Sequence, residues 1–241
     1  MFRFFDLHNH SLCGVDDGAS NFEEMVAMLE ASYADGVRAI CFTPHFSPYH
    51  YGDTSKVSAE AFERISEYAS EKHSDMQLFL GHELGYYPGC LESLQNGRCR
   101  TLAGSRYVLV DFPQSVEFSE LQRGLDSLMR GGFLPILAHA ERYTALYKQI
   151  PWLWDFVASG GLIQLNASSC QASFGSPIRR QWLRLVREGL VHVIASDAHK
   201  LKTRSPQMSV CVSQLQKVFS DEELQRLVWD NAWKIVHNEL L

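Results

Sequence analysis

The feature that most constrains the fold of this 241-residue chain is a regular alternation of short β-rich runs with longer amphipathic runs. Seven β-rich runs are predicted, over residues 2–10, 37–42, 76–80, 107–110, 134–138, 162–165 and 191–195. Apolar residues at helical spacing predict helices over about 20–36, 58–73, 119–130, 152–159 and 178–188, and two C-terminal helices over about 207–219 and 221–240. Connections of this length indicate parallel strands, because antiparallel hairpins need only short turns.

This alternation allows either an open doubly wound sheet or a closed barrel, and the residues at the ends of the predicted strands distinguish the two. Six of the seven runs lead into His, Asp or Glu, whereas the sixth leads into amides and hydroxyls at Asn166, Ser168 and Ser169. An open doubly wound sheet has its site in a crevice between two strands, whereas in a barrel nearly all C-terminal strand ends face one centre. We therefore expect an α/β fold with a single seven-stranded β/α barrel, a distorted TIM-like barrel, formed by one domain over residues 1–241.

Composition argues against several functional classes. The formal net charge is −6 and Lys and Arg are scattered, so the chain has no electrostatic footprint for nucleic acid or for a membrane surface. The first residues lack the apolar core of a secretory signal and no stretch has the apolar length of a membrane span, so we expect a cytoplasmic protein. The six cysteines are widely spaced, as expected for free thiols, and none is followed by Arg six positions later. The phosphate loop of cysteine-dependent phosphatases is therefore absent.

Histidines and carboxylates at the strand ends are the candidate metal ligands. His8 and His10 point to the same side of the first strand because successive side chains alternate, and Asp197 and His199 repeat this spacing after the seventh strand. The full set is His8, His10, Asp17, His45, Glu83, Asp111, His139, Asp197 and His199. Asp16 is the alternative to Asp17, and one of the two is expected to cap the turn before Gly18.

Taken singly, a carboxylate or histidine at a strand end is more often a helix cap or an ordinary polar residue than a ligand. Nine such side chains gathered at one end of a fold would be strongly destabilising unless cations compensated them. The set exceeds the ligands of one ion, so we expect two or three divalent ions, with Glu83 as the bridge. Mixed His and carboxylate ligation suits Mn²⁺, our first candidate, and also Fe or Zn²⁺.

Ions a few Å apart that share a hydroxide and bind a phosphoryl group favour hydrolysis as the reaction class. Arg142 and Arg204 lie just past ligand-bearing strand ends, where a guanidinium group could bind a phosphate through its fork of donors. The alternative for both arginines is an ordinary surface position in a loop.

The motifs resemble, over essentially the whole chain, those of the PHP (polymerase and histidinol phosphatase) superfamily, and within it the bacterial capsular and exopolysaccharide protein-tyrosine phosphatases. The matching segments are DLHNH at 6–10, VDDG at 15–18, His45, ELGYY at 83–87, SRY at 105–107, AHAERY at 138–143, QLN at 164–166, Ser168 and Ser169, HVIASDAH at 192–199 and RSP at 204–206. An HxH pair alone occurs in many hydrolases, whereas this combination in this order is highly specific.

The resemblance implies a seven-stranded barrel with three metal ions. The first ion would be bound by His8, His10, Glu83 and Asp197, the second by Glu83, Asp111 and His139, and the third by Asp17, His45 and His199. Arg142, Arg204 and His199 are the expected catalytic residues, with both arginines on the phosphate. The family usually has Glu where this chain has Asp111, so the shorter side chain is expected to reach the second ion through water or to bind it more weakly.

The implied substrate is phosphotyrosine on the C-terminal tail of a bacterial tyrosine kinase that controls polysaccharide export. Four alternatives remain: a small-molecule phosphatase of the histidinol phosphate type, an exonuclease, an amidohydrolase, and a non-catalytic metal-bound protein that binds the kinase tail. The acidic balance disfavours the nuclease, and Asp111 stands where amidohydrolases often carry lysine.

Overall fold

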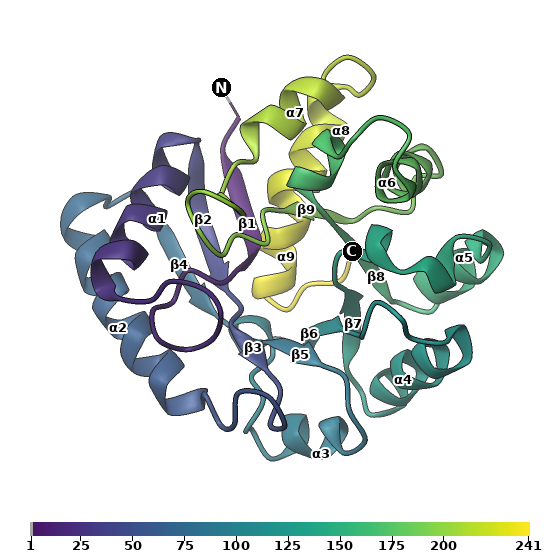
Figure 1. The fold of residues 1–241 in the computed structure, drawn as a ribbon, viewed down its shortest axis with the longest axis horizontal. Helices are drawn as coiled ribbons and strands as arrows, with labels where there is room; N and C mark the ends of the chain where they lie inside the picture. Colours follow the sequence, from purple (N-terminus) through teal and green to yellow (C-terminus); the bar gives the residue numbers. More distant parts are fainter. Residues whose placement is uncertain (1) are drawn as a thin grey trace.

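The computed structural model describes residues 2–241, which form a curled parallel sheet surrounded by helices (Figure 1). Hydrogen bonding divides the strands into two neighbouring groups, with the orders β1-β2-β4 and β3-β5-β6-β7-β8-β9, and the pairs within both groups are parallel. The strands are β1 (Phe4–Asn9), β2 (Val37–Phe42), β3 (His45–Phe46), β4 (Gln77–Leu80), β5 (Glu83–Gly85), β6 (Tyr107–Asp111), β7 (Leu134–Leu137), β8 (Leu162–Asn166) and β9 (Val193–Ala195).

The helices lie mainly outside the curled sheet, where Figure 1 shows α1 to α6 in succession around its rim. They are α1 (Phe22–Ala34), α2 (Ser55–Lys72), α3 (Cys90–Gln95), α4 (Phe118–Arg130), α5 (Ile150–Ala158), α6 (Pro177–Arg187), α7 (Ser209–Leu215), α8 (Asp221–Gln225) and α9 (Asn231–Val236). A π-helical turn, η5 (Arg226–Asp230), joins α8 to α9, and these three segments form residues 221–236 of the helix predicted over 221–240. None of the helices within residues 2–241 is long and apolar enough to cross a membrane.

Two of the seven predicted strand runs, 37–42 and 76–80, are each followed after a two-residue break by a short strand that was not predicted, which is why nine strands are present in the described residues. Thr43 and Pro44 separate β2 from β3, since proline has no N–H to donate to the ladder. Gly81 and His82 separate β4 from β5. Backbone bonds nevertheless link the interrupted runs, because Gly81 N donates to Phe42 O at 2.8 Å.

The sheet curls until its first strand lies beside the end of its last. Asn9 and Ala198 form a parallel β-bridge just beyond β9. Two backbone hydrogen bonds flank it, from His10 N to Ala198 O at 2.9 Å and from Asp197 N to His8 O at 2.8 Å. The C-terminal ends of β1 and β9 are therefore neighbours.

Alternation along the strands produces two apolar clusters on opposite faces of the sheet. The outer cluster packs between the strands and the surrounding helices. The inner cluster is filled by alternate strand residues and by Ala232, Ile235 and Val236 of α9. Tyr107 and Leu109 of β6 belong to the inner cluster, and so do Val193 and Ala195 of β9. The next residues in the same alternation are Asp111 and Asp197, so the strand period itself carries two carboxylates to the C-terminal end of the inner face.

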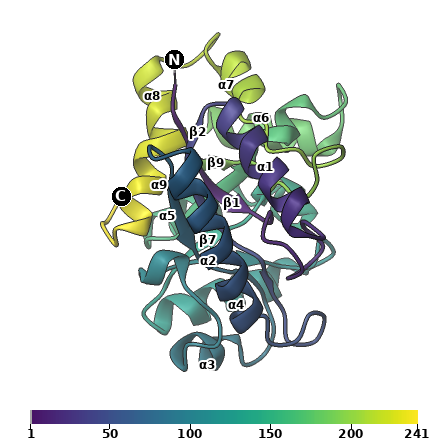
Figure 2. The same cartoon turned by 90° about the vertical axis from the view of Figure 1, so that its left-hand side faces the viewer.

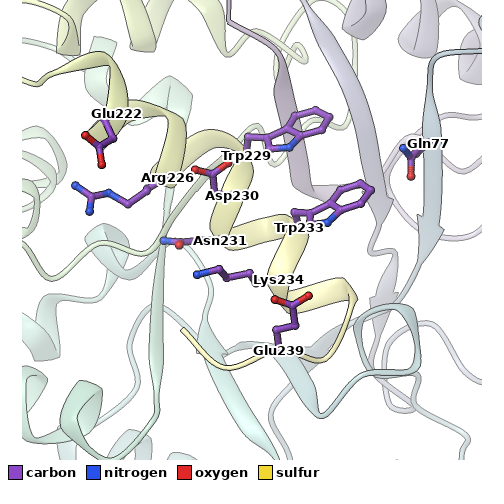
Figure 3. A pocket seen from close by; sticks show the side chains of 9 residues that line it. All are labelled: Gln77, Glu222, Arg226, Trp229, Asp230, Asn231, Trp233, Lys234 and Glu239. Carbon is purple, nitrogen blue, oxygen red and sulfur yellow. The ribbon is translucent and has the colours of Figure 1, made fainter.

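Helices α8 and α9 lie together on one side of the molecule (Figure 2), and α9 packs against the beginnings of the strands. Trp229 packs edge-on against Phe5 with 6.1 Å between ring centroids, and it stacks with Trp233. A cavity of about 590 Å³ runs along α8, η5 and α9 (Figure 3). Its lining residues are Gln77, Glu222, Arg226, Trp229, Asp230, Asn231, Trp233, Lys234 and Glu239. None of these described residues is a histidine or cysteine, and the chemistry-bearing cluster lies at the other end of the strands.

Candidate metal centre

The structure brings all nine of the predicted ligand residues to the C-terminal ends of the strands. They form three groups, within each of which one potential ligand atom per residue lies within 4.8 Å of the others. The groups are His8, His10 and Asp197; Glu83, Asp111 and His139; and His10, Asp17, His45 and His199. These differ from the three sets that the resemblance implies in two respects: Glu83 is not part of the first group, and His10 also lies within reach of the third.

Glu83 of β5 occupies the middle of the cluster. Its side chain is fully buried, and Oε1 lies 3.2 Å from His8 Nε2 and 3.1 Å from His139 Nε2. The other carboxylate oxygen, Oε2, lies 2.8 Å from His45 Nδ1 and 3.4 Å from His10 Nε2. One carboxylate therefore contacts residues of all three groups, which is the position of a bridging ligand.

The charges in this buried site shift its pKa values in opposite directions. Burial alone would lower the pKa of His8, but the charges of Glu83 and Asp197 raise it to about 9. Burial likewise opposes the protonated form of His45, and Glu83 outweighs it and raises the pKa of His45 to about 9. The same imidazoles hold the pKa of Glu83 well below its usual range despite burial. Without a cation the site thus takes up protons, and a cation would displace them.

Two of the candidate ligands have strained backbones. His139 and Asp197 have φ values of 31° and 53°, in the left-handed region that side chains other than glycine rarely adopt. Such conformations cost on the order of 1–3 kcal/mol each and occur preferentially at functional sites. Each lies directly beyond a strand, β7 or β9, where the chain turns beside the cluster.

The polar atoms of the cluster fit a divalent cation. Glu83 Oε2, Asp197 Oδ1 and His199 Nε2 are buried, and their short polar contacts are with other ionisable side chains of the site: His45, Arg204 and Asp17, respectively. His8 Nε2 and His10 Nε2 face each other at 3.0 Å. Their other ring nitrogens contact acceptors, Gln164 Oε1 at 3.1 Å for His8 and Asp16 Oδ2 at 2.8 Å for His10. In neutral imidazoles these contacts put the protons on Nδ1 and leave two converging Nε2 lone pairs, which is the arrangement of a metal chelate.

Asp16 and Asp17 have different positions. Asp17 Oδ1 lies 3.3 Å from His199 Nε2 and 3.5 Å from His45 Nε2, so Asp17 belongs to the third group. Asp16 accepts hydrogen bonds from His10 Nδ1 and, at 2.9 Å, from the backbone N–H of Gly18. A Cβ atom at Gly18 would lie only 1.7 Å from His10 O, so this turn requires glycine.

Both predicted arginines contact Asp197 at the edge of the cluster. Arg142 Nη2 lies 3.1 Å from Asp197 Oδ2, and Arg204 Nη2 lies 2.5 Å from Asp197 Oδ1. The side chains of Arg142 and Arg204 are 23% and 36% exposed, so their remaining donors reach solvent at the mouth of the site. His199 donates from Nδ1 to Asp197 O at 3.0 Å, which leaves its Nε2 to face Asp17.

Sequence reasoning assigned no role to several side chains that contact the candidate ligands. The hydroxyl of Tyr143 donates to Asp111 Oδ1 at 2.7 Å and accepts from Phe112 N at 3.0 Å. Asp111 Oδ1 is 3.7 Å from His139 Nε2. Gln164 and Asn166 of β8 also hydrogen bond to ligand residues. Tyr143 and these amides lay within the matching motifs, but their types gave no signal of ligation.

Comparisons with known proteins agree with this geometry. Residues 4–237 match the family model described as capsular polysaccharide synthesis, CpsB/CapC. The tyrosine-protein phosphatase CpsB of Streptococcus pneumoniae is 31% identical, over 98% of this chain and 99% of its own length. The tyrosine-protein phosphatase YwqE of Bacillus subtilis is 28% identical, over 98% of this chain and 92% of its own.

Solved structures give the same relationship. A structure from a study of B. subtilis YwqE and S. pneumoniae CpsB, described there as unique metal-dependent tyrosine phosphatases, superposes with a TM-score of 0.85 at 26% identity. The superposition covers 98% of this chain and 96% of the other. The resemblance found in the motifs is therefore confirmed, and the chain belongs to the CpsB/CapC family of capsular polysaccharide synthesis proteins.

Proposed function

We propose that this protein is a metal-dependent tyrosine-protein phosphatase that acts in capsular or exopolysaccharide synthesis. The observation that carries this proposal is the contact of one buried carboxylate, Glu83, with histidines of all three ligand groups. Apolar residues would stabilise the fold better than such a cluster of buried charges, whereas the cluster suits a multinuclear metal site. Family membership supports the same activity, because relatives in two genera are named tyrosine-protein phosphatases.

The proposed centre binds two or three divalent ions, with Mn²⁺ as the first candidate. His8, His10, Glu83 and Asp197 would bind the first, Glu83, Asp111 and His139 the second, and Asp17, His45 and His199 the third. When bound, such ions supply Lewis acidity to a phosphoryl oxygen and a hydroxide nucleophile near neutral pH. No cysteine is required for this chemistry, which agrees with the missing cysteine phosphate loop.

Arg142 and Arg204 would bind the phosphate of the substrate. Both now contact Asp197, whose charge they neutralise. When Asp197 binds a cation instead, the guanidinium groups can direct their donors to phosphate oxygens, which a planar fork matches well. The third expected catalytic residue is His199. The atom through which it would take part in the reaction is Nε2, which lies beside Asp17. The leaving group, tyrosinate with a pKa of about 10, needs little help from a general acid.

The proposed substrate is phosphotyrosine on the C-terminal tail of a bacterial tyrosine kinase, and the proposed location is the cytoplasm. One domain over residues 1–241 would carry the site, on a distorted barrel of seven strands in which β2 continues into β3 and β4 into β5. The bridge between Asn9 and Ala198 supports closure of this barrel, and the bond from Gly81 N to Phe42 O supports continuity between the two groups of strands.

The experiment that tests the function compares hydrolysis of a phosphotyrosyl peptide with hydrolysis of histidinol phosphate. Metal-stripped protein is assayed with each substrate, with and without added Mn²⁺. We expect Mn²⁺-dependent turnover with the higher kcat/KM on the peptide. A higher kcat/KM on histidinol phosphate would instead identify a small-molecule phosphatase, and metal-dependent peptide binding without turnover would identify a non-catalytic binding protein.

A matched pair of histidine variants links this activity to the proposed centre. His10→Ala removes a ligand of the cluster, whereas His73→Ala removes a histidine whose Nε2 contacts Glu30 Oε1 at 2.7 Å between α1 and α2. We expect His10→Ala to abolish turnover and His73→Ala to retain it. Equal activities in the two variants would contradict the assignment.

A further inference from the structure

Two buried amides on β8, Gln164 and Asn166, connect two ligands of the same group that come from different strands, His8 and Asp197. We propose that they form an amide relay, a chain of hydrogen bonds from His8 through Gln164 and Asn166 to Asp197, which positions both ligands before a cation binds. This inference deepens the proposed function and rests on it, because it assigns positioning residues to the same metal centre. Neither amide offers a ligand atom to the three groups.

A single backbone group fixes the polarity of the relay. His139 N donates to the side-chain oxygen of Gln164, Oε1, at 2.8 Å. Because a backbone N–H can only donate, the atom that faces it must be the oxygen, and the other end of this side chain must be the NH₂ group. Gln164 Nε2 therefore donates to Asn166 Oδ1, at 2.9 Å.

The same polarity then passes to Asp197. Since Asn166 Oδ1 accepts from Gln164, its Nδ2 is left to donate, and it lies 2.6 Å from Asp197 Oδ2. The other oxygen, Asp197 Oδ1, lies 2.5 Å from Arg204 Nη2 and 3.4 Å from His8 Nε2. Asn166 thus engages Oδ2 and leaves Oδ1 to face Arg204 and the histidine pair.

At its other end the relay selects the tautomer of His8. Gln164 Oε1 lies 3.1 Å from His8 Nδ1, and an amide oxygen can only accept, so the neutral ring carries its proton on Nδ1. The lone pair is then on Nε2, which faces His10 Nε2 and Glu83. A hydrogen bond to the distal ring nitrogen is how proteins commonly orient a metal-binding histidine and raise its basicity.

The surroundings of β8 support a positioning role over general packing. Both amides are fully buried. The backbone of Asn166 is fixed independently of its side chain, because its N–H donates to Glu141 Oε1 at 3.2 Å and its carbonyl accepts from Trp182 Nε1 at 3.0 Å. Leu162, two residues before Gln164, belongs to the inner apolar cluster, so the same face of the strand changes from apolar to amide where the ligands begin.

The test measures cation binding directly. Wild-type protein, Gln164→Met and Asn166→Ala are stripped of metal and titrated calorimetrically with Mn²⁺, and the visible absorption spectrum of the Co²⁺-loaded protein reports ligand geometry. We expect both variants to bind Mn²⁺ about 10- to 100-fold more weakly, the usual effect of losing an outer hydrogen-bond partner of a ligand, and to show a changed Co²⁺ spectrum. Asn166→Ala keeps both backbone bonds of residue 166, so it provides a second test if Gln164→Met, which leaves His139 N–H unpaired, proves unstable.

Gln181→Met is the matched control. Gln181 lies on α6, is 4% exposed, and its Nε2 makes no hydrogen bond within the described residues. This variant therefore removes a buried glutamine of the same size without touching a ligand, and we expect wild-type Mn²⁺ affinity and Co²⁺ spectrum. The relay is wrong if both β8 variants bind Mn²⁺ as the wild type does, or if Gln181→Met weakens binding equally. Failure of the wild type to bind Mn²⁺ would instead contradict the proposed metal function.

Discussion

Removing the hydroxyl of Tyr143 should weaken both the fold and the second ligand group. In Tyr143→Phe, Asp111 Oδ1 loses a donor at 2.7 Å and Phe112 N loses its acceptor at 3.0 Å. Tyr143 and Phe112 are both buried, so water does not replace the bond to Phe112 N. A buried N–H left unpaired costs about 1–3 kcal/mol, and for a chain of this size each kcal/mol lowers Tm by roughly 2–4 °C. The metal-free variant should therefore unfold roughly 2–12 °C below the wild type.

The effect on metal binding follows from the protonation of Asp111. Burial and the charge of Glu83 raise the pKa of Asp111, whereas the hydrogen bond from Tyr143 lowers it. Without that bond the pKa of Asp111 rises further, and a proton competes more strongly with the cation. We expect an affinity loss of about 10- to 100-fold for the ion beside Asp111, larger at low pH than at high pH because only the carboxylate binds metal.

Tyr107→Phe provides the matched control for this variant. Tyr107 is also buried, and its hydroxyl donates to Glu239 O at 2.7 Å, at the end of the inner cluster remote from the ligand residues. Its removal should lower stability by about 0.5–1.5 kcal/mol and leave Mn²⁺ affinity unchanged. The two variants are compared by thermal unfolding in chelator and by Mn²⁺ titration at several pH values. Equal metal affinities in Tyr143→Phe, Tyr107→Phe and the wild type would refute the reasoning.

Three further predictions follow from single residues. Asp111→Glu should raise metal occupancy after dialysis, because the longer side chain reaches further toward His139; full, tight occupancy in the wild type with no gain in the variant would contradict this. Arg142→Lys and Arg204→Lys should each raise KM for a phosphotyrosyl peptide by roughly tenfold, since an ammonium group lacks the fork of donors, and an unchanged KM would place that arginine outside the phosphate site. Burial lowers the pKa of His192 to about 4 from 6.5, so its contribution to stability is complete above pH 6.5 and declines by up to about 3 kcal/mol as pH falls toward 4. Denaturant unfolding of His192→Asn should show a shallower acid decline than the wild type; parallel curves would exclude His192 as the cause.

Local periodicity accounts for the parts of the structure that the sequence predicted well. In a strand the side of each residue depends only on its place in the alternation, so the proximity of His8 and His10 follows from their spacing. Parallel strands then bring their ends to one edge, which explains why Glu83, Asp111 and His139 meet although they come from different units. The convergence of the ligand candidates at the strand ends therefore required no knowledge of rotamers.

Outside the regular strands, the sequence did not predict where individual side chains lie. Residues 16 and 17 lie in a loop, where no alternation assigns sides, and only the contacts of Asp17 with His45 and His199 distinguish it from Asp16. The break between β4 and β5 at Gly81 also carries no signal as clear as that of Pro44. These features depend on how distant segments pack.

Side chains that orient ligands are the hardest class to predict, because their chemistry does not identify them. The sixth predicted strand, which is β8 in the structure, differs from the other six in leading into an amide and hydroxyls, which are weak metal ligands. Gln164 nevertheless contacts His8, which lies 156 positions earlier in the chain, and the direction of its amide depends on one backbone N–H, that of His139. An amide has no preferred polarity until such a donor fixes it, so only three-dimensional contacts can distinguish a positioning amide from a packing one. The neighbours of β8 are β7 and β9, which lead into the ligand candidates His139 and Asp197. As the strand without a ligand, β8 is therefore where a metal site of this architecture would hold the groups that orient its ligands.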